Sequence, residues 1–383
     1  MNACSQTPER PAVHRPIRFT TLAQDPSTSA RLGRLDTPHG PVDTPAFMPV
    51  GTQATVKGLS PDQIRDTGTQ MLLANTYHLA LRPGEGTIAA LGGLHAFMGW
   101  DGPILTDSGG YQVFSLADRN RVDDHGVVFR SHLDGRLLEL TPERAMIIQQ
   151  DLGADVAMCL DHCPALPASR EEIGQAVDRT ISWAVRCKKA HVRADQSLFG
   201  IVQGGSHADL RTRCAEALLA LDLDGYAVGG VSVGETREEV TRALDVTAHL
   251  LPADRPRYLM GVGRPQDLLT AVATGIDLFD CVLPTRNGRN ATCFTSTGLV
   301  KLRNAAYKQD ERPIEDGCEC LACRRFSRAY LRHLFLAKEM LGPILASIHN
   351  LTYLQRLTGR IRRAILEGRL VQLRLEVLEA LGP

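Results

Sequence analysis

The sequence lacks any long hydrophobic run. Although 43% of its 383 residues are hydrophobic and 22% are charged, no stretch approaches the roughly 18 uninterrupted apolar residues that a membrane helix needs. Residues 1–15 are polar and contain proline, so they also lack the apolar segment of a secretory signal. We therefore expect a soluble, globular protein that is located in the cytoplasm and does not bind a membrane.

Net charge is absent as well, because 43 lysines and arginines balance 43 aspartates and glutamates. This balance does not exclude a nucleic-acid partner, since the charges are unevenly distributed. Residues 281–383 hold 17 basic and 9 acidic side chains, a net charge of +8, which leaves −8 for residues 1–280. A basic region of this kind is typical of a surface that follows phosphates, and a solvated helical surface is the alternative.

The chain has no low-complexity segment and no internal repeat apart from one recurring alternation. Short apolar runs that end in polar or Gly-rich turns are each followed by a longer segment of helical pattern, which predicts βα units. Eight runs fit this description, at residues 44–50, 71–74, 103–106, 155–160, 198–202, 226–228, 257–260 and 277–279. Eight successive units predict an α/β fold, the (β/α)8 TIM barrel, rather than a doubly wound sheet.

Local signals support this prediction. Ser60, Ser169 and Thr236 each precede a Gln or Glu by three residues, which is the spacing of a helix capping box. Thr141 is followed by a proline at a first helical position. Residues 18–34 and 126–140 do not fit the repeat, and because both alternate apolar and polar residues around turn signals, we expect them to form added hairpins.

A cysteine cluster marks a change of pattern after Asn290. Ten cysteines in so long a chain do not indicate a secreted disulfide framework, and Cys318, Cys320 and Cys323 crowd into a polar segment that offers them no core. We interpret the three as zinc ligands. A closed tetrahedral site needs a fourth ligand, for which two downstream histidines, at positions 333 and 349, compete.

Arg-rich amphipathic segments follow the cluster from about residue 327. We therefore expect two domains. Residues 1–300 would form the TIM-barrel catalytic domain with its N-terminal hairpin, and residues 301–383 would form a zinc-binding subdomain with basic C-terminal helices.

Carboxylates stand at the ends of the predicted strands, where TIM barrels place their chemistry. Asp107, Asp161 and Asp280 each follow an apolar run. Aspartates at such positions commonly cap helices or turns, but three of them at one mouth indicate glycosidic chemistry, in which one carboxylate attacks the anomeric carbon and another handles protons. Because Asp280 stands among apolar residues, its charge is poorly solvated, and we predict that it is the nucleophile.

Uncharged groups accompany these carboxylates. Gln203 and the backbone at Gly229 and Gly230 offer amides that suit the edge of a neutral heterocycle. Tyr111 and Met260 could stack on a ring, although a methionine at a strand end usually belongs to the core.

Three segments of the sequence closely resemble the signatures of bacterial tRNA-guanine transglycosylases. They are residues 107–113 (DSGGYQV), 199–205 (FGIVQGG) and 279–290 (FDCVLPTRNGRN), and the resemblance extends from about residue 18 to residue 349. The family is a TIM barrel with a zinc subdomain. In queuosine biosynthesis it replaces the wobble guanine of tRNAs with GUN anticodons, those for aspartate, asparagine, histidine and tyrosine, by 7-aminomethyl-7-deazaguanine (preQ1).

The resemblance implies two catalytic roles. Asp280 would attack C1′ of the ribose and expel guanine, which leaves a covalent RNA intermediate. Asp107 would be the general acid/base that takes a proton from the incoming base. Neither ATP nor a nicotinamide is implied, because two glycosidic bonds of similar energy are exchanged.

The resemblance also implies binding roles. Asp161, Gln203 and the Gly230 backbone would bind the edge of the base. Tyr111 and Met260 would lie above and below its ring. Cys163 would line the pocket. Arg286 and Arg289, which follow closely after the nucleophile, would hold flanking phosphates of the tRNA.

By the same resemblance, His349 rather than His333 completes a structural site for one Zn²⁺ per subunit, which would hold the basic helices against the barrel rim. The family is homodimeric. Phe326, Tyr330 and His333 share one face of a predicted helix, and although such a stripe is usually core, we consider it as the dimer contact.

Two positions depart from the family's pattern. His162 stands where bacterial members usually carry Glu, beside the base-reading Asp161, which leaves substrate preference at that point open. Ala291 stands where Gly is common, and we expect little effect from it.

Three alternatives compete with this interpretation. Another barrel enzyme could hydrolyse a nucleoside or glycoside, and it would need no incoming base. A non-catalytic tRNA-binding subunit would be expected to lack the nucleophile, whereas this chain has both Asp280 and Asp107. A transglycosylase of the archaeal or eukaryotic kind is disfavoured by Cys163, by Val233 and by the expected lack of a further C-terminal RNA-binding domain.

Overall fold

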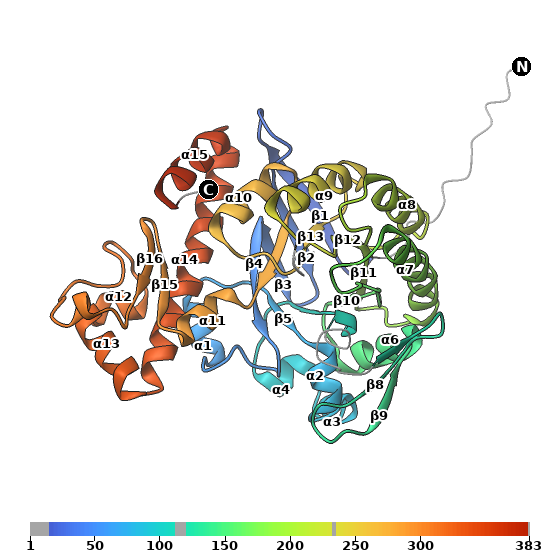
Figure 1. Cartoon of the computed structure of the whole chain (residues 1–383), viewed down its shortest axis with the longest axis horizontal. Coiled ribbons are helices and arrows are strands. Elements are labelled where there is room, and N and C mark those ends of the chain that lie inside the picture. The colour runs from blue at the N-terminus through green and yellow to red at the C-terminus, as the bar shows by residue number, and fades with distance from the viewer. Residues whose placement is uncertain (1–14, 112–119, 232–234, 382–383) are drawn as a thin grey trace, which may run out of the picture.

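A closed barrel of eight parallel strands forms the centre of the molecule in the computed structural model, which describes residues 15–111, 120–231 and 235–381 (Figure 1). In spatial order the strands are β10 (Val156–Met158), β11 (Ser197–Val202), β12 (Gly225–Val228), β13 (Arg257–Leu259), β14 (Leu278–Cys281), β4 (Ala46–Gly51), β5 (Leu72–Ala74) and β6 (Ile104–Thr106). Each lies within or overlaps one of the eight predicted runs. The TIM-barrel prediction is therefore confirmed.

The barrel closes where β14 pairs in parallel with β4, with Leu278 opposite Ala46 and Phe279 opposite Phe47. Its interior is filled by large side chains from alternate positions of the strands, among them Met48, Leu105 and Tyr258. Such filling makes the barrel a packed core, so only its rim can receive a ligand.

Helices surround the barrel and cover the outer faces of its strands (Figure 1). They are α1 (Pro61–Asp66), α2 (Thr76–Leu81), α3 (Glu85–Ala90), α4 (Gly93–Met98), α6 (Pro142–Leu152), α7 (Arg170–Ala190), α8 (Ala208–Leu219), α9 (Arg237–Leu250), α10 (Pro265–Ala273) and α11 (Leu283–Arg289). The three predicted capping boxes at Ser60, Ser169 and Thr236 have both of their hydrogen bonds, and Thr141 caps α6 through the backbone N–H of Arg144.

Two small antiparallel sheets are added to the barrel. One comprises β1 (Arg18–Gln24), β2 (Arg31–Thr37) and β3 (Gly40–Thr44), and the other comprises β7 (Asn120–Val122), β8 (Val127–Arg130) and β9 (Leu137–Leu140). Both predicted hairpins are thus present, and each gains a third strand. The sequence pattern did not separate β3 because it runs directly into β4, and β7 is too short to show an alternation.

The C-terminal region begins with the hairpin of β15 (Thr292–Thr295) and β16 (Gly298–Lys301). The 3-10 turn η1 (Ala305–Tyr307) and helices α12 (Leu321–Arg325), α13 (Arg328–Ala337), α14 (Leu341–Leu366) and α15 (Leu370–Leu381) follow. Figure 1 shows β15, β16, α12 and α13 on one side of the barrel, with the long α14 between them and the barrel. The division of the chain at residue 300 stays a prediction, and β16 runs across it.

Helix α14 attaches this region to the barrel. Gln355 donates from Nε2 to the carbonyl of Phe47 at 3.0 Å, and Arg362 donates from Nη1 to the carbonyl of Pro45 at 2.8 Å. Within the described ranges, no helix combines the length and the apolarity that a membrane crossing requires.

Candidate active site

The predicted catalytic and base-binding residues lie at the carboxyl ends of the barrel strands. Asp107 directly follows β6, Gln203 directly follows β11, and Asp280 lies within β14. Carboxyl ends of parallel strands in a closed barrel face one rim, so the fold brings these side chains to the same mouth.

Asp280 holds its two carboxylate oxygens in different surroundings. Oδ1 accepts hydrogen bonds from the hydroxyl of Tyr258 at 2.5 Å and from the backbone N–H of Gly261 at 2.8 Å. Oδ2 has no hydrogen-bond partner among the residues that the structure describes. Burial raises the pKa of Asp280, and the two hydrogen bonds only partly offset that rise. One oxygen is therefore fixed, and the other is available to attack.

Tyr258 was missed by the sequence analysis. Its side chain is fully buried on β13, and its pKa is raised well above the usual value by burial and then by the charges of Asp280 and Asp107. The hydroxyl therefore keeps its proton and acts as a donor. The available signal was the strand itself, since Tyr258 stands two residues before Met260 and thus on the same face of an extended segment.

Asp107 is held by donors from the segment after the neighbouring strand β5 and from its own turn. Its Oδ1 accepts from the backbone N–H groups of Thr76 at 2.9 Å and Gly109 at 3.2 Å, and Asn75 donates from Nδ2 to Oδ2. Asn75 is itself fixed because its side-chain oxygen caps α2 at the N–H of His78. Only 8% of Asp107 is exposed, so its orientation is set by these contacts rather than by solvent.

Asp161 and Gln203 form a buried hydrogen-bonded pair at the same mouth. Gln203 donates from Nε2 to Oδ2 of Asp161 at 2.7 Å, and Ser108 donates from Oγ to Oδ1 at 3.0 Å. Burial raises the pKa of Asp161 against the effect of both hydrogen bonds. A side chain at Gly230, where φ is +60°, would place its Cβ 2.4 Å from Oε1 of Gln203. Glycine at this position thus leaves Gln203 in place and the backbone within reach of a ligand.

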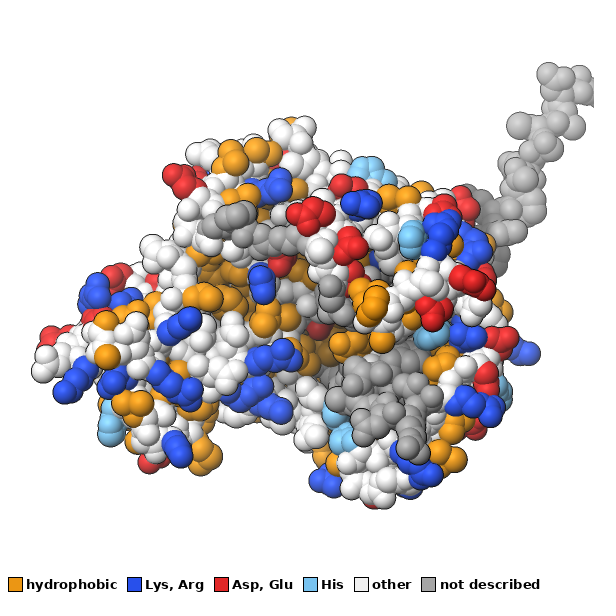
Figure 2. All heavy atoms as spheres, in the orientation of Figure 1, with side chains coloured by type: hydrophobic (Ala, Val, Ile, Leu, Met, Phe, Trp, Pro, Cys, Tyr) orange, Lys and Arg blue, Asp and Glu red, His pale blue; other side chains and the backbone are white. Residues whose placement is uncertain are grey.

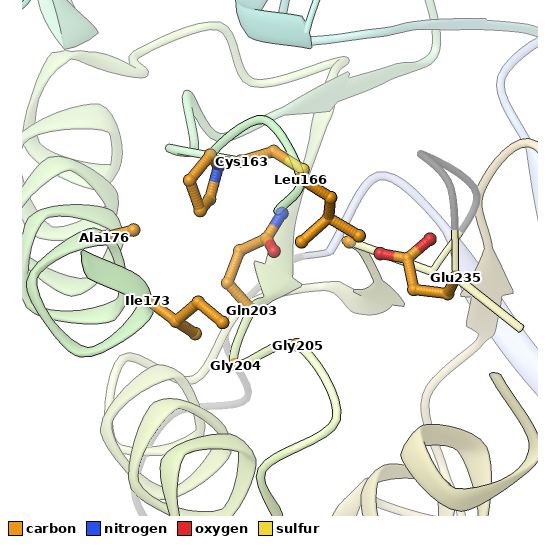
Figure 3. Close-up of a pocket in the computed structure, with 10 residues that line it drawn as sticks. Cys163, Leu166, Ile173, Ala176, Gln203, Gly204, Gly205 and Glu235 are labelled. Atoms are coloured by element: carbon orange, nitrogen blue, oxygen red, sulfur yellow. The ribbon is translucent and has the colours of Figure 1, made fainter. Parts of the chain in front are cut away.

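A pocket opens next to this pair. Figure 3 shows side chains of Cys163, Gln203 and Glu235 around it, with Ile173 and Ala176 from α7 on one side. Burial, together with the charges of Asp161 and Glu235, raises the pKa of Cys163 to about 12, so its thiol lines the pocket without charge. Glu235 was missed by the sequence analysis, because it directly precedes the N-cap of α9 and resembles an ordinary helix-start carboxylate.

Arg211 lies behind this pocket and was also missed. It is fully buried on α8 and donates to backbone carbonyls: Nε to Gly205 at 2.6 Å, and Nη2 to Gly229 at 3.1 Å and Gly230 at 3.4 Å. Burial lowers the pKa of Arg211 to about 10, so it remains a cation at neutral pH. One guanidinium group therefore joins the loop after β11 to the loop after β12.

The two predicted stacking residues differ in exposure. Tyr111 is 48% exposed at the border of a described range, and Met260 is half-buried against the core of the barrel interior. Met260 directly follows β13, and Tyr111 follows β6 by a few residues, so both belong to the carboxyl side of the barrel. Of the residues named from the sequence, Gln112, Val113 and Val233 lie outside the described residues.

Helix α11 carries the two predicted phosphate ligands just past Asp280. Arg286 is exposed and Arg289 is half-buried, and neither forms an ion pair within the described part of the chain. Burial and the charge of Arg286 lower the pKa of Arg289, and its buried Nη1 lacks a hydrogen-bond partner among the described residues. Two adjacent cations without a carboxylate favour an anionic ligand. Figure 2 shows further Lys and Arg side chains gathered over the C-terminal elements.

Three thiols and one imidazole converge in the C-terminal region. The Sγ atoms of Cys318, Cys320 and Cys323 lie 3.7, 3.5 and 3.3 Å from Nδ1 of His349, and all four ligand atoms lie within 4.8 Å of one another. A tetrahedral zinc ion with its usual bond lengths would separate sulfur from nitrogen by about 3.5 Å, so the group fits the ion. Nε2 of His349 faces the carbonyl of Phe294 at 2.7 Å, which fixes the ring. His333 is not part of the cluster.

The residue next to His349 connects this centre to α11. Asn350 donates from Nδ2 to the carbonyls of Pro284 at 2.9 Å and Thr292 at 3.0 Å. A Cβ on Gly288 would lie 2.6 Å from Oγ of Ser347, so α11 and α14 are in close contact. Helix α14, which carries His349, thereby supports the helix that carries Arg286 and Arg289.

His162 does not line the pocket beside Gln203. Its side chain points toward α7, where Nδ1 lies 3.0 Å from Nη1 of Arg179, and it borders a second pocket with Glu172 and Gln175. Burial and the charge of Arg179 lower the pKa of His162 to about 4. The departure from the family's pattern at this position therefore introduces a neutral ring outside the residues that were predicted to hold the base.

Comparison with known proteins gives a consistent result. A model of the family described as Queuine tRNA-ribosyltransferase matches residues 25–383. A queuine tRNA-ribosyltransferase of Pelotomaculum thermopropionicum is 54% identical over 362 residues, 94% of this chain and 98% of the relative. One of Syntrophobacter fumaroxidans is 55% identical over 347 residues (91% and 93%), and one of Thermus thermophilus is 54% identical over 354 residues (92% and 91%). The similarity spans nearly the whole chain.

Proposed function

Because the chain belongs to the queuine tRNA-ribosyltransferase family, we propose that it exchanges the wobble guanine of tRNA for preQ1 through a covalent intermediate on Asp280. Family membership makes it an enzyme, a glycosyltransferase of the tRNA-guanine transglycosylase type that acts on tRNA. The incoming base, the anticodons and the intermediate are proposed from the site.

The observation that carries the mechanism is the unequal bonding of the Asp280 carboxylate. Tyr258 and Gly261 hold Oδ1, so Oδ2 attacks C1′ of the ribose while the bond from C1′ to N9 of guanine breaks. Asp107 in its acid form gives N9 of the departing guanine a proton and is left as a carboxylate. In the second half, N9 of the incoming base attacks C1′, its proton passes to Asp107, and the carboxylate of Asp280 is released. Like bonds are exchanged, so no external energy source is needed.

The base-binding set suits a guanine-like ring. Gln203 and the backbone of Gly230 present amide groups to its edge, and Asp161 accepts from its N–H groups, with Cys163 closing the pocket. Tyr111 and Met260 would lie against the two faces of the ring. Glu235 adds a carboxylate to the same pocket, which complements the aminomethyl cation that distinguishes preQ1 from guanine.

The RNA would enter as a loop with one base splayed out, because a base inside a stem cannot reach the barrel rim. Arg286 and Arg289 would neutralise the phosphates that flank the target nucleotide. The substrates would be tRNAs with GUN anticodons, for aspartate, asparagine, histidine and tyrosine, and the enzyme would work in the cytoplasm, where these tRNAs are found.

The Cys318, Cys320, Cys323 and His349 group would hold one structural Zn²⁺ per subunit. When bound, the ion closes the cluster and takes no part in the reaction, since all four positions are filled by the protein. The chain would act as a homodimer. Phe326 ends α12 and, contrary to the sequence prediction, does not share a helix with Tyr330 and His333 of α13. Its ring nevertheless stacks on that of Tyr330 with centroids 5.3 Å apart, and 39% of Tyr330 is exposed, so this aromatic surface is available for the second subunit.

A trapping experiment tests the proposal. The enzyme is incubated with tRNA labelled at the wobble guanine, with or without preQ1, and the products are separated on a denaturing gel. We expect label release with preQ1 and an RNA-linked protein band that is lost in Asp280→Ala. The Asp107→Asn variant keeps the nucleophile, so it should still form the band, but it should form the band and turn over more slowly than the wild type. A band that persists in Asp280→Ala, or no label release by the wild type, would contradict the mechanism.

A further inference from the structure

A second group of metal-type ligands lies at the opposite end of the barrel from the catalytic mouth. Asp155 directly precedes β10, so it stands at the amino end of the strands. His39 lies in the turn between β2 and β3, and His95 lies on α4. One ligand atom from each of the three residues lies within 4.8 Å of the others.

Each imidazole contacts a different oxygen of the carboxylate. Nδ1 of His39 lies 2.8 Å from Oδ1 of Asp155, and Nε2 of His95 lies 3.1 Å from Oδ2. The two rings stack with centroids 3.5 Å apart and an interplanar angle of 12°. Both donor nitrogens therefore face the same carboxylate from adjacent, nearly parallel rings.

The electrostatics of this group are incomplete without a cation. The side chain of Asp155 is fully buried, and within the described residues no Lys or Arg forms an ion pair with it. Its oxygens accept hydrogen bonds from the backbone N–H groups of His39 at 3.2 Å and Ile104 at 2.8 Å, and they face the two imidazoles.

We propose that His39, His95 and Asp155 bind a divalent transition-metal ion of the zinc type. Two imidazoles and a carboxylate are ligands that Zn²⁺ accepts, and usual bond lengths would separate each nitrogen from a carboxylate oxygen by about 3.3 Å. The structure needs only a small opening from 2.8 and 3.1 Å. Each imidazole would coordinate the ion through the nitrogen nearest Asp155, and a proton carried on that nitrogen would move to the other ring nitrogen or to solvent.

The exposure of the two histidines shows how the ion would reach the site. The side chain of His39 is 40% exposed, so the ion can enter from solvent and keep water as a further ligand, whereas His95 is 11% exposed. The bound ion would join three segments that are distant in sequence: the β2–β3 turn, α4 and the start of β10. Because none of them reaches the catalytic mouth, the ion would stabilise the fold and leave the chemistry unchanged.

Zinc stoichiometry of the whole chain tests the site directly. The protein is saturated with Zn²⁺, dialysed, and its bound zinc is measured by mass spectrometry. We expect two equivalents per chain in the wild type, one for the cysteine centre and one for this site. His39→Ala and His95→Ala should each retain one equivalent. His125→Ala is the matched control, because His125 is exposed on the β7–β8 turn and should retain two.

A thermal readout keeps the test independent of activity. Added Zn²⁺ should raise the melting temperature of the wild type and of His125→Ala by several degrees beyond the shift in His39→Ala, with rates of base exchange alike in all three. A single equivalent in the wild type, or a second equivalent that survives in both His39→Ala and His95→Ala, would overturn the proposal.

Discussion

The hydrogen bond from Tyr258 to Asp280 allows one prediction to be worked through in detail. Replacing Tyr258 by Phe removes the hydroxyl that donates to Oδ1 at 2.5 Å and leaves the ring that fills the barrel interior. Only the backbone N–H of Gly261 then remains to hold that oxygen. The fold should survive, because no side-chain volume in the core is lost apart from one oxygen atom.

The magnitude follows from the strength of such a bond. A hydrogen bond to an ionised group contributes about 1.5 to 3 kcal/mol, and one pKa unit corresponds to about 1.4 kcal/mol. Since this bond lowers the pKa of Asp280 against the rise caused by burial, its removal should raise that pKa by about one to two units. Fewer molecules then carry the nucleophile in its ionised form at acidic pH.

The assay is the pH dependence of kcat/KM for base exchange, whose acid limb reports the ionisation of groups in the free enzyme. We expect the acid limb of Tyr258→Phe to move upward by about one to two pH units. Tyr226→Phe is the matched control: Tyr226 lies on the neighbouring strand β12, and its hydroxyl accepts from the backbone N–H of Leu223 at 3.1 Å. An unmoved acid limb in Tyr258→Phe, with a uniform loss of rate at every pH, would refute the reasoning.

Three further predictions follow from the same geometry. Burial raises the folded-state pKa of Asp280 above its unfolded value, so ionisation of Asp280 costs stability once the pH exceeds the unfolded pKa. Asp280→Asn should therefore melt at a higher temperature than the wild type at pH 7. This gain should disappear below about pH 4. Calorimetry across pH checks this, and an equal gain at acidic pH would contradict it. Arg211→Lys keeps a positive charge but cannot reach the carbonyls of both pocket loops. The KM for the incoming base should therefore rise about tenfold, a loss of about 1.4 kcal/mol in binding, while the KM for tRNA stays constant. Steady-state kinetics with each substrate varied in turn measures the two KM values, and an unchanged KM for the base would count against the assigned role. Cys320→Ser should lose the metal proposed for the cysteine cluster, and hydrogen exchange should rise in β15, α12 and α13 before it rises in β10 to β12. Uniform protection from exchange in that variant would show that the cluster does not hold the C-terminal region together.

The barrel was predictable because its signal is local and repeated. Each strand is a short apolar run next to a turn, and capping boxes such as Ser169 with Glu172 mark the helices between them. The carboxylates at strand ends were predictable for the same reason, since the fold assigns every such position to one rim. Strands β3 and β7 were not, because neither shows a pattern that separates it from its neighbours.

The residues that sequence reasoning missed reach their partners only when the barrel brings distant segments together. Nothing in the sequence around Arg211 distinguishes it from a surface arginine on an amphipathic helix, yet the barrel places its guanidinium behind two loops that follow different strands. Tyr258 resembles an ordinary core aromatic until β14 pairs with β13 and brings Asp280 to its hydroxyl. His162 shows the reverse, because adjacency to Asp161 in sequence did not place it in the pocket.

The most direct test of the central claim is to identify the amino acid that carries the RNA. The trapped complex is digested with ribonuclease and protease, and the adduct is located by mass spectrometry. The proposed mechanism predicts a ribose-linked adduct on the carboxylate of Asp280, with a mass that lacks guanine. An adduct on Asp107 or any other residue, or guanine release without an adduct under trapping conditions, would contradict it.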